Sequence, residues 1–158
     1  GVGRVLVAAT EMGVCSVTIG ASEGALVRDL KREYPAAAIS EAPNARSEWT
    51  RAIAQHVRGD APDLDLPLDI QATAFQWKVW RELQRIPYGE TRSYGDVAKR
   101  IGKPRAVRAV ARACATNPVA LVVPCHRVVP AAGGTGGYRW GEKTKKTLLA
   151  REARAKSL

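Results

Sequence analysis

The sequence predicts a fold in two parts: an α/β N-terminal part followed by a mostly helical C-terminal part. The chain has 158 residues, enough for one compact domain or for two small ones that share a core. Two β-prone runs and two helical segments fill residues 4–59, whereas the part after residue 72 is dominated by helical segments. Between the two parts, "GDAPDLDLPLD" (59–69) is rich in Pro and Asp, and we predict that it is the linker.

Charge divides the chain at the same place. Residues 1–70 hold 7 Lys and Arg against 10 Asp and Glu, a net charge of −3, whereas residues 71–158 hold 18 against 5, a net charge of +13. A basic half indicates a polyanionic partner, although a solvated basic surface is the alternative. No apolar stretch approaches the length of a bilayer span and no signal-peptide pattern opens the chain, so no membrane partner is expected. Because residue 1 is Gly and not Met, the chain is consistent with a fragment of a longer protein.

The N-terminal part begins with a predicted hairpin over residues 4–19, in which "EMG" separates two β-prone runs. A helix is expected over 22–34 with Ser22 as its N-cap, and a second over 46–59 that ends at Gly59. His56 falls on this second helix, where nothing nearby in the sequence completes a site, so we interpret it as structural.

Four helices are predicted in the C-terminal part. The first, over 73–86, carries an apolar stripe; the second, over 93–102, has Ser93 as N-cap and Asp96 as its capping-box partner. Pro104 is expected to start the third, over 104–115, and the last runs from about 142 to 154. The stripe of the first helix consists of Phe75, Val79, Leu83 and Ile86, with Trp80 beside it.

The second and third of these helices, separated by a turn that contains Gly, resemble a helix-turn-helix, although an ordinary helical hairpin is the alternative. The third helix has many alanines, including Ala109, and it presents Arg105, Arg108 and Arg112. It contains no Asn or Gln to contact base edges, so we expect it to lie against phosphates or in a widened minor groove.

The apolar run "LVVPCHRVVP" (121–130) contains Cys125, His126 and Arg127 in succession. Neighbours on a strand point to opposite faces, but Pro124 favours a turn after a short "LVV" strand. We predict that the turn exposes the thiol beside the imidazole and that the pKa of Cys125 is lowered. The alternative is a buried structural cysteine.

The other cysteines, Cys15 and Cys114, suggest no disulfide framework, and with two histidines in the chain there is no zinc constellation. We interpret Cys114 as a small packed side chain. The segment "GGYRWGEKT" (136–144) departs from a phosphate-binding loop because Glu142 follows Gly141 where Lys is required.

Together, "SYGDVAKRIGKPRAVRAVARACATNP", "PCHRVV" and "GYRWG" closely resemble the O6-alkylguanine-DNA alkyltransferases, most of all the C-terminal half of the bacterial Ada protein. The resemblance is strong over residues 72–153 and weak before them. It implies a ribonuclease-H-like α/β domain over 1–68. It also implies an alkyltransferase domain over 69–158 with a winged-helix or helix-turn-helix element for DNA.

The resemblance also implies a role for each matching residue. Cys125 would be the alkyl acceptor, His126 its base through a bridging water, and Glu152 the group that orients His126. Asn117 would brace the site, Tyr94 would assist the departing guanine and contact DNA, and Arg108 would replace the extruded nucleotide. The remaining positions are implied to bind DNA (Arg105, Ala109, Arg112), to shape the base pocket (Pro118, Pro124, Val128) or to close over the flipped base (Tyr138, Arg139).

By this resemblance the chain would be a single-turnover repair protein for O6-alkylguanine, and for O4-alkylthymine, in double-stranded DNA. It would use no cofactor or metal and act in the cytoplasm as a monomer. Two rivals stay open on the residues alone. A DNA-binding module would use the helix-turn-helix but not Cys125, and a cysteine hydrolase would use Cys125 and His126 over many turnovers.

Overall fold

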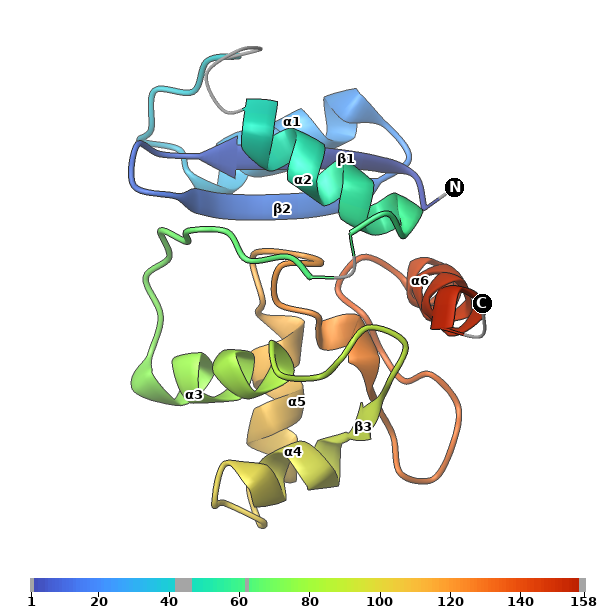
Figure 1. Cartoon of the computed structure of the whole chain (residues 1–158). Helices are drawn as coiled ribbons and strands as arrows, with labels where there is room; N and C mark the ends of the chain where they lie inside the picture. The colour runs from blue at the N-terminus through green and yellow to red at the C-terminus, as the bar shows by residue number, and fades with distance from the viewer. Residues whose placement is uncertain (1, 42–46, 62, 157–158) are drawn as a thin grey trace.

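A computed structural model of the chain describes residues 2–41, 47–61 and 63–156. A hairpin with two helices forms one half of the molecule, and α3, α4 and α5 form the other, with α6 beside them (Figure 1). The coarse prediction of an α/β part followed by a mostly helical part is therefore confirmed.

The N-terminal half is built on an antiparallel pair, β1 (Arg4–Ala9) and β2 (Val14–Gly20), with a register shift between Ala8 and Ala9. The predicted hairpin is confirmed. Helix α1 (Glu23–Glu33) starts after Ser22, whose hydroxyl accepts a hydrogen bond from the Ala25 amide. Helix α2 (Ser47–Arg58) follows the predicted second segment; its expected start at residue 46 lies outside the described residues.

The predicted linker lies against β2. The Val14 amide donates to the Pro67 carbonyl (2.8 Å), and the Asp69 amide donates to the Val14 carbonyl (2.9 Å). The approach requires Gly at position 13, because a Cβ there would lie 2.6 Å from the Pro67 oxygen. Further along β2, Val17 forms an isolated parallel bridge with Val119, so this strand contacts the C-terminal half as well.

The C-terminal half contains α3 (Ala74–Leu83), α4 (Tyr94–Arg100), α5 (Val107–Ala115) and α6 (Glu142–Lys156). The capping box of Ser93 and Asp96 at α4 is present as predicted. The predicted start of the third helix is wrong. Pro104 occupies a turn closed by the Ala106 amide on the Lys103 carbonyl (2.9 Å), and α5 begins only at Val107. Pro suits the second position of such a turn as well as a first helical turn, so its presence alone did not decide between them.

One hydrophobic core joins the two halves. Val14, Val17 and Ile53 from the N-terminal half belong to the same buried cluster as Val79 and Trp80 of α3. The Trp80 indole donates to the Ala113 carbonyl at 2.9 Å and so fixes α3 against α5. Within the described residues, no helix is both long and apolar enough to cross a membrane. The boundary at residues 68 and 69 stays a prediction.

Candidate functional site

The segment from Asn117 to Arg127 is a series of turns, not a strand. Val119 makes one bridge to β2, Leu121 adopts a φ of 73°, and a 3₁₀ turn covers Cys125–Arg127. The predicted "LVV" strand is therefore wrong, because the left-handed backbone at Leu121 turns the chain away after this single bridge. The predicted turn at Pro124 is confirmed. It leads into a short strand, β4 (Val128–Val129), which pairs with β3 (Arg92–Ser93) in front of α4.

The thiol of Cys125 is held by Asn117, which is completely buried. The Asn117 side-chain amide donates to the Cys125 sulfur (3.2 Å) and to the Val123 carbonyl (2.9 Å), and its oxygen accepts from the Val119 amide (3.0 Å). Because these bonds use both ends of the amide, the side chain has one stable orientation. Asn117 thus fixes the position of the sulfur.

Cys125 is buried, with 3% of its surface exposed, and not exposed as predicted. Burial raises the pKa of the thiol to about 11, while the Asn117 hydrogen bond and the nearby charge of Lys145 act in the opposite direction without outweighing it. The predicted lowering of this pKa is therefore wrong. The sulfur is a neutral thiol at neutral pH, so nucleophilic chemistry here requires a base that removes its proton.

The residues that follow Cys125 belong to a buried hydrogen-bonded group. Nε2 of His126 lies 2.6 Å from Glu152, and Arg127 donates to the same carboxylate through Nε (2.8 Å) and Nη2 (3.2 Å). Burial alone would raise the pKa of Glu152, but its hydrogen bonds with His126 and Arg127 and the Arg127 charge bring the pKa to about 2. Glu152 is thus an anion that accepts hydrogen bonds from both neighbours.

The acceptor character of Glu152 fixes the tautomer of His126. Because the carboxylate accepts, Nε2 carries the ring proton, and because burial lowers the pKa of His126, the ring is neutral. The lone pair is then on Nδ1, which is buried and has no hydrogen-bond partner among the described residues. An unpaired buried acceptor on the residue that follows the thiol in the chain is suited to take up a proton.

Tyr94 and Tyr138 are the two tyrosines that the sequence predicts at the site. Tyr94 begins α4, is half-buried, and burial raises its pKa to about 12, with smaller contributions from Cys114 and Cys125. It therefore keeps its proton and can donate it. The ring of Tyr138 meets that of His126 edge-on at 6.4 Å; its predicted role of closing over a flipped base stays a prediction.

Lys145 is a site residue that the sequence interpretation missed. It is fully buried, and its ammonium donates to the carbonyls of Val128 (2.7 Å) and Gly137 (3.2 Å). It also lies 5.9 Å from the centre of the Tyr94 ring. Lys145 thereby contacts three segments: Val128 after the turn of Cys125–Arg127, the 130–141 loop, and Tyr94. A signal was present: Lys145 precedes Leu148 by three residues and Glu152 by seven, so all three lie on one face of α6.

The residues expected to contact DNA form an exposed surface on α5 and the turn before it. Their side chains make no hydrogen bond or ion pair within the part of the chain that the structure describes, and Val107 beside them is an exposed apolar residue. These residues are Arg105, Arg108, Ala109 and Arg112. Tyr94, by contrast, lies at the start of α4 on the side of the thiol.

The predicted pocket residues divide. Val128 and Pro124 flank the catalytic turn, but the Val128 carbonyl already accepts from Lys145. Arg139 reaches in the other direction and donates to the Asn117 carbonyl at 2.8 Å. Arg139 lines a cavity beside β2 and α1, Pro124 and Arg127 line a second cavity, and Cys125 lines neither. Among the described residues there is no cluster of His, Cys, Asp or Glu suited to a metal ion.

Comparison with known proteins gives concordant results. Residues 74–154 match the family described as "6-O-methylguanine DNA methyltransferase, DNA binding domain". The chain is 46% identical over 151 residues to the bifunctional transcriptional activator/DNA repair enzyme Ada of Escherichia coli. This alignment covers 96% of the chain but 43% of Ada, so the chain spans less than half the length of that relative.

Two crystal structures from Mycobacterium tuberculosis have the same fold. O6-methylguanine methyltransferase is 34% identical, with a TM-score of 0.81 over 98% of this chain and 88% of that protein. The structure of OGT in complex with DNA is 31% identical, with a TM-score of 0.78 over 98% of this chain and 89% of that one.

Proposed function

This chain belongs to the 6-O-methylguanine DNA methyltransferase family, and on that premise we propose that it repairs O6-alkylguanine in DNA by moving the alkyl group onto its own Cys125. One observation carries the proposal: the Cys125 sulfur is held by Asn117 while the free nitrogen of a neutral His126, oriented by Glu152, is available as a base. The relatives named as DNA repair enzyme and methyltransferase support it.

The reaction begins with loss of the thiol proton. His126 Nδ1 accepts it through a bridging water, and Glu152 stabilises the imidazolium that forms, since its carboxylate is 2.6 Å from Nε2. The thiolate then attacks the alkyl carbon, so that the S–C bond forms as the C–O6 bond breaks. The electron pair of the broken bond passes to guanine, to which Tyr94 donates a proton. The proton held by His126 restores Tyr94, and the charges balance.

The product on the protein is a thioether. In the part of the chain that the structure describes, His126 has no second nucleophile beside it to activate against a carbon–sulfur bond, so the thioether is not hydrolysed. Each molecule therefore acts once, and the protein is a stoichiometric reagent that needs no cofactor.

DNA would bind through α4 and α5, which we interpret as a helix-turn-helix within a winged-helix element. O6 of guanine lies inside the base stack, so the nucleotide must be turned out of the duplex, at a cost of a few kcal/mol. The small side chains of α5 allow its backbone to approach a shallow minor groove, and Arg108 would fill the space that the nucleotide leaves. The mycobacterial relative in complex with DNA supports this partner.

The remaining expectations rest on the family resemblance. The N-terminal half would be a ribonuclease-H-like domain over residues 1–68, followed by the alkyltransferase domain over 69–158. The helices and the two-stranded sheet of residues 4–58 are compatible with part of such a domain. O4-alkylthymine as a second substrate, a monomeric state and a cytoplasmic location stay predictions.

The experiment that tests the proposal is a titration of a duplex that contains one O6-methylguanine. We expect the amount of repaired guanine to reach a plateau at one per protein molecule, because the acceptor is consumed. A cysteine hydrolase would act over many turnovers, and a module that only binds DNA would leave every lesion unrepaired. Either of those results would refute the proposal.

Replacing Arg108 by Ala tests the role of α5. We expect transfer from duplex DNA to slow by about ten- to a hundredfold, because a few kcal/mol of unstacking is no longer compensated. Transfer from the free base O6-benzylguanine should be unchanged, since no flipping is required. Rates with the two substrates, measured under single-turnover conditions, separate the cases. If both rates fall equally, Arg108 has another function.

A further inference from the structure

Strand β2 of the N-terminal half binds the segment that follows Asn117, the residue whose side chain hydrogen-bonds the Cys125 sulfur. The Val17 amide of β2 donates to the Pro118 carbonyl (2.9 Å), and the Ala120 amide donates to the Val17 carbonyl (3.0 Å). These bonds fix the chain on the C-terminal side of Asn117, immediately before the left-handed residue Leu121. The position of Asn117 therefore depends on an element almost 100 residues earlier in the sequence.

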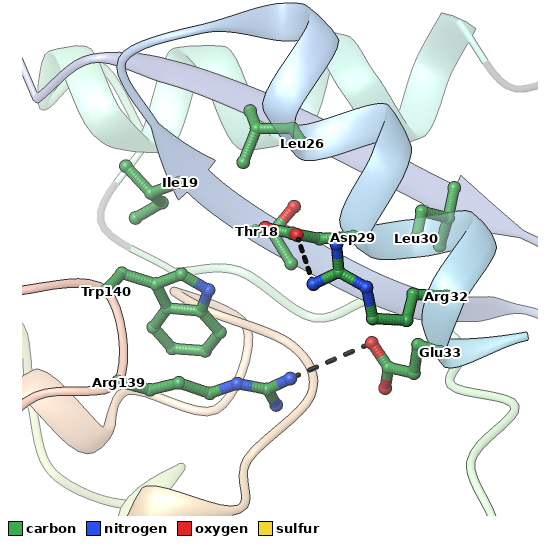
Figure 2. Close-up of a pocket in the computed structure, with 9 residues that line it drawn as sticks. All are labelled: Thr18, Ile19, Leu26, Asp29, Leu30, Arg32, Glu33, Arg139 and Trp140. Atoms are coloured by element: carbon green, nitrogen blue, oxygen red, sulfur yellow. Dashed lines mark hydrogen bonds and ion pairs between the residues drawn. The ribbon is translucent and has the colours of Figure 1, made fainter.

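Arg139 makes a third connection to this segment. Its Nη1 donates to the Asn117 carbonyl at 2.8 Å, and its Nη2 lies 3.7 Å from Glu33 at the end of α1. Figure 2 shows the two side chains pointing toward one another across a cleft, with Trp140 beside the guanidinium. The Arg139 guanidinium also lies 5.3 Å from the centre of the Trp140 ring. Three groups thus orient one guanidinium.

The contacts form a continuous series from α1 to the sulfur: Glu33, Arg139, the Asn117 backbone, the Asn117 side chain and Cys125. The ion pair is about one-third exposed on each side and contributes little energy by itself. The charge-assisted bond to the Asn117 carbonyl is stronger and directional. The effect of Glu33 is therefore to aim the guanidinium rather than to stabilise the fold.

We propose that Arg139 is a positioning residue for the thiol, and that the N-terminal half acts through Glu33 and Arg139 to keep Asn117 in place to hydrogen-bond the Cys125 sulfur. This deepens the proposed function, on which it rests. It assigns Arg139 to the contacts that fix Asn117 beside the thiol, in place of the predicted role of closing over a flipped base.

Several groups act on the thiol besides Arg139, and the test has to separate them. The Arg139 charge lowers the pKa of Cys125, as does the charge of Lys145. The other titratable groups that face it are Cys114 of α5, Tyr94 of α4, Tyr138 of the loop and His126 of the turn. None of these is changed in the variants below, so their contributions cancel between variants.

The test compares Glu33→Gln with Asp29→Asn and Arg139→Met. Each of the first two removes one negative charge from α1, but Asp29 pairs with Arg32 and not with Arg139. The rate of alkylation of Cys125 by iodoacetamide, localised by fragmentation mass spectrometry, is measured against pH without DNA. Single-turnover transfer from the free base O6-benzylguanine and from duplex DNA is measured alongside.

Loss of a negative charge alone would lower the pKa of the thiol and speed alkylation. If Glu33 acts by position, Glu33→Gln instead raises the pH midpoint of alkylation and slows alkylation about two- to threefold. Asp29→Asn should react at the wild-type rate or slightly faster. Arg139→Met should raise the midpoint by about 0.5 to 1 unit, and slow transfer from free base and duplex alike by about three- to tenfold.

The proposal is overturned if Glu33→Gln behaves as Asp29→Asn, or if Arg139→Met slows duplex transfer alone. Should Arg139→Met fail to fold, Glu33→Gln alone decides between the outcomes. Because iodoacetamide reports on the thiol without any DNA lesion, these results stand whether or not the chain proves to repair O6-methylguanine.

Discussion

Replacing Cys125 by Ser should reduce transfer from an O6-methylguanine duplex to background while the affinity for that duplex stays at the wild-type value. A hydroxyl is a far weaker nucleophile than a thiolate and is not ionised by an imidazole at neutral pH. Binding should persist because the sulfur is buried behind the turn, whereas the exposed arginines lie on α5. Repair is measured by product analysis of the duplex, and binding by fluorescence anisotropy.

The matched control is Cys114→Ala. Cys114 is buried on α5 close enough to influence the Cys125 thiol, but burial raises its own pKa far above neutrality. Its hydrogen bond to the site is through the backbone, where its carbonyl accepts from the Asn117 amide (3.3 Å), and replacing its side chain keeps that bond. This variant should repair at close to the wild-type rate. Transfer that survives in Cys125→Ser, or that disappears in Cys114→Ala, would mean that the acceptor has been assigned to the wrong residue.

Replacing Glu152 by Gln should have the largest effect on stability. Glu152 accepts from His126, twice from Arg127 and from the Gly89 amide, and it is almost completely buried. The variant leaves the Arg127 charge buried without a counter-ion, which costs about 3–5 kcal/mol in the free energy of unfolding. Repair should also fall sharply, because the imidazolium that forms at His126 loses its stabilising anion. Denaturant unfolding and single-turnover repair measure the two effects.

Glu142→Gln is the control, since it removes an exposed acid from the same helix. Glu142 pairs with Lys146 at the surface, so its loss should cost less than about 1 kcal/mol and leave repair unchanged. Equal destabilisation by the two substitutions would argue against a buried charge network centred on Glu152.

The same carboxylate predicts a pH dependence. The pKa of Glu152 falls from its usual 4.5 to about 2 in the folded chain. A depressed pKa means that the folded state binds the proton less readily, so the stabilisation is fully present above about pH 4.5 and is lost as the pH falls toward 2. The difference in unfolding free energy between wild type and Glu152→Gln should therefore shrink over that window and stay constant above it.

Local signals in the sequence were sufficient for most of the fold. The hairpin, the caps at Ser22 and Ser93, and the stripe on α3 each depend on residues within a few positions of one another. Pro104 was misassigned because the same residue suits a β-turn and a first helical turn. The "LVV" run was misassigned because its burial comes from packing against both halves, and burial alone does not distinguish a strand from a tight series of turns.

The residues of the candidate site were predictable from the sequence, but the protonation state of its thiol was not. The segment around Cys125 predicted a thiol beside an imidazole, and the family resemblance implied the other three catalytic residues. The structure places Asn117, His126 and Glu152 in contact with the thiol or with one another. The raised pKa of Cys125 could not be predicted, because it results from burial by segments distant in sequence. The Arg139 contact with Glu33 was out of reach for the same reason: 106 positions separate them.

The proposed reaction requires that Cys125 itself receives the alkyl group. The most direct measurement is the intact mass of the chain after incubation with excess duplex that contains O6-methylguanine, followed by fragmentation to locate the modification. We predict a single methyl-sized increase, one per molecule and confined to Cys125, that does not grow with time. An unmodified mass with repaired DNA, or a methyl group on another residue, would contradict the claim.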